Sequence, residues 1–169
     1  MQQRRILSTK ENMANIQLTT FVAAPVPRVF NLSRNISIYR KVFNAPNERF
    51  DFSGSDNHLS PGDSVSIQAR HISRFRSISL KVTSFEQPWY YQEELIKGDL
   101  PFYKHEHHFK EIDNGSIMID VISYGHPNDL IGKMLASFYM KTYIEKLANE
   151  RNRLIKEYAE SEKWRVLIS

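Results

Sequence analysis

Two long runs of strand-forming residues flank Asp113-Asn114-Gly115, and this arrangement constrains the fold more than any other part of the chain. Asn-Gly between two such runs is the strongest local signal for a tight β-hairpin. The second run ends at Gly125-His126-Pro127, after which Asn128 or Asp129 suits the N-cap of a helix. The proline disfavours helical backbone in the residue before it. This stretch therefore predicts strand, tight turn, strand and helix start.

The register of the hairpin decides which side chains share a face. With Asn114-Gly115 at the centre of the turn, His107 pairs with Ile122, and Asp120 is its diagonal neighbour. Side chains alternate between faces, so a shift by one residue would exchange them. One face then carries His105, His107, Phe109, Met118, Asp120, Ile122 and Tyr124. Such a mixture of polar and apolar groups suits the wall of a cavity better than a dry core.

The opposite face of the hairpin carries an apolar stripe formed by Ile117, Ile119 and Val121. An exposed apolar stripe usually marks a contact. We therefore expect the C-terminal tail or a second subunit to cover it.

Composition limits the class of protein. The 169 residues are enough for one domain, which buries about 70% of its unfolded surface. The chain has no cysteine, which excludes disulfides and cysteine-ligated zinc. No apolar run approaches the roughly 20 residues of a membrane helix. The net charge of +4 is interleaved with acidic residues, so we expect no nucleic-acid binding. We expect a soluble cytoplasmic protein, as a monomer or a weak homodimer.

The rest of the chain predicts one antiparallel sheet followed by a long helix. Strands are expected in the hairpin and at residues 15–21, 48–53, 64–71, 75–85 and 89–96. Helical patterns occupy residues 26–32 and 36–43. Residues 129–162 show an apolar stripe with helical spacing, and Arg151 falls within that stripe. Short connections between the strands favour antiparallel neighbours.

The predicted fold class is α+β, with a seven-stranded antiparallel sheet wrapped around the long C-terminal helix. The sheet cannot bury both faces by itself, so the helix is expected across its concave face. The two short helices then close one end. We expect a flexible tail at residues 1–14, one ligand-binding domain at 15–162 and a second tail at 163–169.

Five short motifs resemble those of a known superfamily. They are residues 24–30 (Ala-Pro-Val-Pro-Arg-Val-Phe), 98–102 (Gly-Asp-Leu-Pro-Phe), 105–109 (His-Glu-His-His-Phe), 115–120 (Gly-Ser-Ile-Met-Ile-Asp) and 124–127 (Tyr-Gly-His-Pro). In this order they resemble the START-like SRPBCC superfamily, and within it a bacterial subgroup of uncharacterised, polyketide cyclase-like ligand-binding proteins. Asp99-Leu100 is an insertion relative to that subgroup, and Lys104 replaces its usual aromatic residue.

The resemblance covers roughly residues 15–160 and implies the helix-grip fold, with a cavity between the sheet and the long helix. The superfamily includes START lipid-transfer domains, plant pathogenesis-related ligand carriers, coenzyme Q-binding proteins and aromatic polyketide cyclases. It implies a fold and a cavity, and it implies no particular reaction.

His105, His107 and Asp120 form the first candidate site, because they share one face of the hairpin. The favoured interpretation is that they are structural or anchor a ligand. His107 oriented by Asp120 also suits a general base near neutral pH. Two histidines and a carboxylate suit zinc or non-haem iron, but a helix-grip wall rarely holds a metal and no further strong ligand is evident. We therefore expect no metal.

Glu93 and Glu94 lie near the hairpin, and one of them must face inward if their strand is central. We expect a salt bridge across the rim of the sheet. The alternative is a carboxylate in the cavity with a pKa that desolvation raises. The residues expected to line the cavity are Tyr91, Glu93, His105, His107, Phe109, Met118, Asp120, Ile122, Tyr124, Leu135 and Phe138.

The sequence favours a carrier or sensor of a hydrophobic small molecule, such as a lipid, a polyketide or an aromatic compound, that needs no cofactor. One alternative is a cyclase or dehydratase that uses His107 and Asp120. Another is an interaction module that uses the outer apolar stripe. The chain has no phosphate-binding loop, nucleophile elbow or His-Glu-x-x-His motif, which removes most common enzyme classes.

Overall fold

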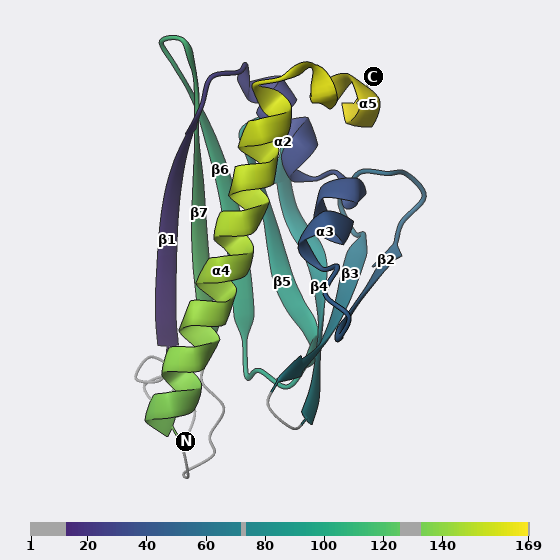
Figure 1. Ribbon diagram of the computed structural model, residues 1–169, viewed down its shortest axis with the longest axis vertical. Coiled ribbons are helices and arrows are strands. Elements are labelled where there is room, and N and C mark those ends of the chain that lie inside the picture. Colours follow the sequence, from purple (N-terminus) through teal and green to yellow (C-terminus); the bar gives the residue numbers. More distant parts are fainter. Residues whose placement is uncertain (1–12, 72–73, 126–132, 169) are drawn as a thin grey trace.

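In the computed structural model, one seven-stranded antiparallel sheet carries a long helix across one face (Figure 1). The structure describes residues 13–71, 74–125 and 133–168, without the side chains of residues 70–76 and 133–138. The strands are β1 (Met13–Val22), β2 (Glu48–Ser53), β3 (Ser64–His71), β4 (Arg74–Glu86), β5 (Tyr90–Gly98), β6 (Tyr103–Ile112) and β7 (Gly115–Gly125). Their order is β1-β7-β6-β5-β4-β3-β2, so β5 is the central strand. The predicted α+β class and strand number are confirmed.

The helices gather on the same face of the sheet. They are α2 (Val26–Ser33), α3 (Ile36–Val42), α4 (Lys133–Ala159), the 3-10 turn η1 (Glu162–Trp164) and α5 (Arg165–Ile168). Asn35 starts α3, because its side chain accepts a hydrogen bond from the amide of Ser37 at 2.9 Å. The predicted start of the long helix at residues 128–129 lies outside the described residues. None of the described helices is both long and apolar enough to span a bilayer.

The hairpin of β6 and β7 has a register that differs from the predicted one by two residues. Asp113 and Asn114 form the turn, Ile112 pairs with Gly115, and His107 pairs directly with Asp120. Asn114 adopts a φ of 66°, a left-handed conformation that asparagine tolerates better than most residues. A shift by two residues preserves the faces, so the predicted inward set stays on the buried face.

The C-terminal segment takes a position that the sequence did not predict. Instead of covering the outer face of the sheet, it lies beside α2, where Asn35 Nδ2 donates to the carbonyl of Leu167 at 3.0 Å. The guanidinium of Arg28 lies 4.4 Å from the ring centre of Trp164. The segment stays there because its apolar side chains find partners at this end of the core. The outer stripe of Ile117, Ile119 and Val121 is half-buried without it.

The core between the sheet and the helices has two parts. One part surrounds Phe30 of α2, whose ring makes edge contacts with Phe85, Tyr91 and Phe109. We call these four residues the Phe30 cluster. The second part lies under the N-terminal half of α4 and includes Leu80, Ile122 and Ile144, together with the cavity described below. Buried polar side chains of β5, β6 and β7 lie between the two parts.

Candidate functional site

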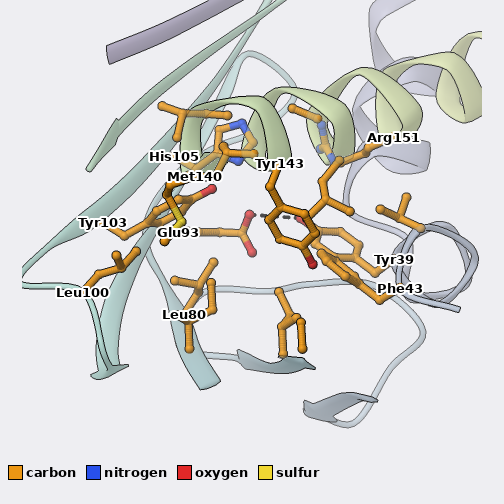
Figure 2. A pocket seen from close by; sticks show the side chains of 18 of the residues that line it. Tyr39, Phe43, Leu80, Glu93, Leu100, Tyr103, His105, Met140, Tyr143 and Arg151 are labelled. Carbon is orange, nitrogen blue, oxygen red and sulfur yellow. Dashed lines mark hydrogen bonds between the residues drawn. The ribbon is translucent and has the colours of Figure 1, made fainter. Parts of the chain in front are cut away.

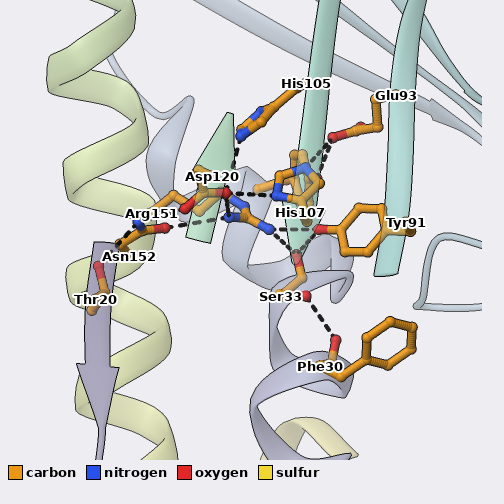
Figure 3. A network of polar contacts seen from close by, with 11 residues as sticks. Thr20, Phe30, Ser33, Tyr91, Glu93, His105, His107, Asp120, Arg151 and Asn152 are labelled. Atoms are coloured by element: carbon orange, nitrogen blue, oxygen red, sulfur yellow. Dashed lines mark hydrogen bonds and ion pairs between the residues drawn. The ribbon is translucent and has the colours of Figure 1, made fainter. Parts of the chain in front are cut away.

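His107 lies between two carboxylates in the middle of the sheet (Figure 3). Its Nδ1 is 2.7 Å from Oδ1 of Asp120, and its Nε2 is 3.1 Å from Oε2 of Glu93. All three side chains are almost completely buried. A neutral imidazole has only one N–H to donate. With a neutral ring and both carboxyl groups ionised, one ring nitrogen would therefore face a carboxylate oxygen without a proton between them.

Asp120 connects β6 and β7 to the long helix. Its Oδ1 is 3.0 Å from Nε2 of His105, and its Oδ2 accepts a hydrogen bond from Nδ2 of Asn152 at 2.7 Å. Nη1 of Arg151 lies 3.4 Å from the same Oδ1. Arg151 and Asn152 both belong to α4, so one buried carboxylate links the sheet to the helix.

Arg151 reaches from α4 toward the end of α2. Its Nη2 donates to the carbonyl of Ser33 at 2.8 Å and to the hydroxyl of Tyr91 at 2.5 Å. Its Nε is buried and has no hydrogen-bond partner among the described residues. A buried donor without a partner costs about 1–3 kcal/mol. This unmet donor therefore offsets part of the stability that the other contacts of Arg151 provide.

The charges in this network are fixed by burial and by the contacts above. Burial raises the pKa of Asp120, but hydrogen bonds with His105 and His107 outweigh it and hold the pKa well below its usual range. Burial likewise opposes ionisation of Glu93, and the hydrogen bond with His107 outweighs it, so the pKa is lowered. Burial, reinforced by the neighbouring His107, lowers the pKa of His105 to about 4. At neutral pH both carboxylates are charged and His105 is neutral.

A cavity of about 110 Å³ lies between the sheet and α4 (Figure 2). Apolar and aromatic side chains form most of its wall, including Phe43, Leu80, Leu100, Tyr103, Met140 and Ile144. The polar part of the wall consists of Glu93, Asp99, His105 and Arg151, together with the tyrosines Tyr39, Tyr103 and Tyr143. The cavity therefore combines a large apolar surface with a carboxylate, an imidazole and a guanidinium at one side.

Glu93 projects into this cavity and does not form the expected salt bridge at the rim. Its side chain is buried, and the hydroxyl of Tyr39 donates to its Oε2 at 3.0 Å. Burial raises the pKa of Tyr39 well above its usual range, so the phenol remains a donor at neutral pH. The rim prediction fails because β5 is the central strand, where an inward side chain is covered by helices.

The structure separates the predicted cavity residues into three groups. Glu93, His105 and Ile122 line the cavity. His107, Asp120 and Tyr124 are fully buried and are not among its lining residues. Tyr91, Phe109 and Met118 belong to the core around Phe30. The side chains of Leu135 and Phe138 lie outside the described residues.

Three polar residues of the site were not among the predicted site residues. They are Tyr39, Arg151 and Asn152. Arg151 did carry a signal, because a cation within the apolar stripe of a helix must face the core and needs anionic partners there. Tyr39 and Asn152 carried none, since a tyrosine or an asparagine in a helix can face either the core or the solvent.

The site has two chemical capacities. Glu93, His107 and Asp120 form a hydrogen-bonded chain through which a proton can be exchanged between the cavity and the buried aspartate. In addition, Glu93, His105 and His107 offer metal-ligating atoms that all lie within 4.8 Å of one another.

Comparison with known proteins was made at three levels. No protein-family model matches the chain, and no curated protein sequence matches it. Solved structures do match. The di-domain ARO/CYC BexL from the BE-7585A biosynthetic pathway aligns with a TM-score of 0.71 and 13% identity, over 94% of this chain and 53% of that chain. The Zhui aromatase/cyclase from Streptomyces sp. R1128 aligns with a TM-score of 0.69 and 11% identity, over 88% of this chain and 94% of that chain.

The chain shares the helix-grip fold with these solved structures. TTHA0849 from Thermus thermophilus shares it, with a TM-score of 0.67 and 12% identity over 84% of this chain and 97% of that chain. The resemblance seen in the sequence motifs is thereby confirmed at the level of the fold. A helix-grip protein places its cavity between the sheet and the long helix, which is where the cavity lies here.

Proposed function

We propose that this helix-grip protein binds a small, mainly apolar molecule that carries at least one polar group. The observation that supports the proposal is the composition of the cavity wall, which is mainly apolar and carries a few polar groups, among them Glu93, His105 and Arg151. Ligand sites commonly combine an apolar surface with a few convergent polar groups. The guanidinium of Arg151 in the wall favours a hydrogen-bond acceptor on the ligand, and the Glu93 carboxylate favours a donor.

The size of the cavity limits the ligand. Its volume of about 110 Å³ is somewhat smaller than the ~150 Å³ engineered cavity that accommodates benzene. A single ring is therefore the scale that fits, and a larger ligand requires the lining side chains to move. Burying about 300 Å² of apolar ligand surface contributes about 7 kcal/mol. Association costs reduce this gain, so we expect an affinity on the order of micromolar.

A second candidate function is an enzyme of the cyclase or dehydratase kind. The hydrogen-bonded chain from Asp120 through His107 to Glu93 favours it, because it ends at the cavity. His107 itself does not line the cavity, so we propose Glu93 or His105 as the group that exchanges a proton with a substrate. BexL and Zhui, which share the fold, are described as aromatase/cyclases.

We further propose that the protein is cytoplasmic, that it acts as a monomer or a weak homodimer, and that it does not bind nucleic acid. The mild net charge of +4 supports the last point, because acidic side chains are interleaved with the basic ones.

The proposal is tested by filling the cavity. Ala148 of α4 lines the cavity, and Asn149 beside it is exposed. Binding of phenol, a single ring with one polar group, is measured by calorimetry for the wild type, Ala148→Leu and Asn149→Leu. We expect at least tenfold weaker binding for Ala148→Leu and no change for Asn149→Leu. Equal binding by both variants would show that phenol does not enter the cavity and would contradict the proposal.

Native mass spectrometry of the protein purified from its own host, against a denatured control, then identifies the bound molecule. A retained mass that is lost in Ala148→Leu supports a carrier. Turnover of an aromatic or polyketide substrate that is abolished in Glu93→Gln supports the enzyme instead.

A further inference from the structure

We propose that Glu93, His105 and His107 bind a divalent transition-metal ion at the polar wall of the cavity. The three side chains come from the adjacent strands β5 and β6, and all are buried. This inference goes beyond the binding of a small apolar molecule. It does not depend on that binding, because the test uses the metal ion alone.

The spacing of the three side chains suits a shared ion. Their ligand atoms all lie within 4.8 Å of one another. Nε2 of His107 and Oε2 of Glu93 are 3.1 Å apart. Two ligands at 2.0–2.1 Å from a tetrahedral zinc ion lie about 3.3 Å apart. Nε2 of His107 and Oε2 of Glu93 are therefore already close to the separation of two ligands of one ion, and a ring nitrogen of His105 lies near the same position.

Asp120 gives both histidines the support that metal ligands usually have. A ligating histidine normally donates its other N–H to a carboxylate, which fixes its tautomer and its orientation. Asp120 Oδ1 lies 2.7 Å from Nδ1 of His107, which leaves Nε2 of His107 as the coordinating atom. The same oxygen lies 3.0 Å from Nε2 of His105 and orients that ring. Asn152 in turn holds the second oxygen of Asp120 at 2.7 Å.

The local charge favours a cation between His107 and Glu93. Two carboxylates, Glu93 and Asp120, face this cluster, and Arg151 is the cation among the described residues that contacts it. With a neutral His107, one ring nitrogen would direct its lone pair toward a carboxylate oxygen. A metal ion at Nε2 of His107 removes that repulsion and leaves the hydrogen bond to Asp120 intact.

The ligand set and its position indicate which ion would bind and how. Two imidazoles and one carboxylate form a donor set used by zinc and by non-haem iron(II). Glu93 and His105 line the cavity, so the remaining coordination positions of the ion face the cavity. A bound ion would thus meet the polar group of any molecule in that cavity.

The test uses untagged protein that has been treated with EDTA and dialysed. It is titrated with Zn²⁺ alone, and the heat of binding is measured by calorimetry. We expect one ion per chain. Glu93→Gln and His105→Gln should each weaken binding at least tenfold, and Asp120→Asn should weaken it ten- to a hundredfold, because it supports the ligands without contacting the ion. His108→Gln is the matched control, since His108 lies on the outer face of β6 and should bind as the wild type does.

A second titration with Co²⁺ reads the ligand environment directly through its visible absorption bands. Circular dichroism confirms that each variant is folded. The proposal is overturned if the wild type shows no saturable Zn²⁺ binding, or if folded Glu93→Gln and His105→Gln both bind Zn²⁺ as tightly as His108→Gln.

Discussion

Asp120 on β7 lies directly opposite His107 on β6, and their side chains are joined at 2.7 Å in a part of the core that no solvent reaches. The pairing is a consequence of the hairpin register. This register buries the carboxylate of Asp120, whose charge must be balanced by groups from other elements. Arg151 of α4 is one of these groups. The network therefore fixes how the helix sits on the sheet.

Arg151→Met should strongly destabilise the protein. The substitution leaves Asp120 buried without its cationic partner from α4, and breaking a buried pair in this way costs about 3–5 kcal/mol. The measurement is the free energy of unfolding from urea denaturation. Arg153→Met is the control, because Arg153 lies two residues along α4 and pairs only with exposed glutamates. Similar stabilities for the two variants would contradict a supporting role for the buried network.

Stability should fall as the pH decreases from 6.5 to 4 because of His105. Its pKa is lowered from 6.5 to about 4 in the folded protein. Below pH 6.5 the unfolded chain takes up a proton that the folded chain does not, so the folded state loses up to about 3 kcal/mol by pH 4. Below this range, the lowered pKa of Asp120 produces a further loss.

Denaturant unfolding of EDTA-treated protein between pH 8 and pH 3 measures this dependence. His105→Gln should flatten the curve between pH 6.5 and 4, and His108→Gln, on the outer face, should retain the wild-type slope. A wild-type slope in His105→Gln would assign the titration to another group.

The sequence predicted the fold well because local patterns and burial agree throughout the sheet. Alternation along β6 and β7 fixed the inward face even though the predicted turn was displaced, since a shift by two residues leaves every side chain on the same face. It did not fix which inward residues pair, so Asp120 was expected diagonal to His107, whereas the structure pairs the two directly.

The candidate site could be predicted only in part, because its membership depends on contacts between distant elements. The position of Glu93, in the cavity or at the rim, could not be predicted because neither alternation nor composition tells a central strand from an edge strand. Tyr39 and Arg151 lie on α3 and α4, far from the hairpin in sequence, and only the packing of the helices brings them to Glu93 and Asp120. The boundary between the cavity and the Phe30 cluster likewise follows from the position of α2.

Asn114 should tolerate glycine but not a β-branched residue. It occupies the left-handed region with a φ of 66°. Asn114→Val should therefore destabilise the protein by about 1–2 kcal/mol, and Asn114→Gly should be nearly neutral. The free energies of unfolding of the two variants are compared under the same conditions. If Asn114→Val left the free energy of unfolding unchanged, the turn would have to adopt another conformation in solution.

Trp164 should stabilise the domain without affecting the cavity. Its ring lies under the guanidinium of Arg28 and packs against the core around Phe30, and no described residue beyond Arg151 lines the cavity. Trp164→Ala should cost about 1–2 kcal/mol through lost burial and lost cation–π contact. Val166→Ala, at a position that is 83% exposed, should change little. Both variants should bind phenol as the wild type does. A loss of phenol binding in folded Trp164→Ala would mean that the C-terminal segment forms part of the ligand site.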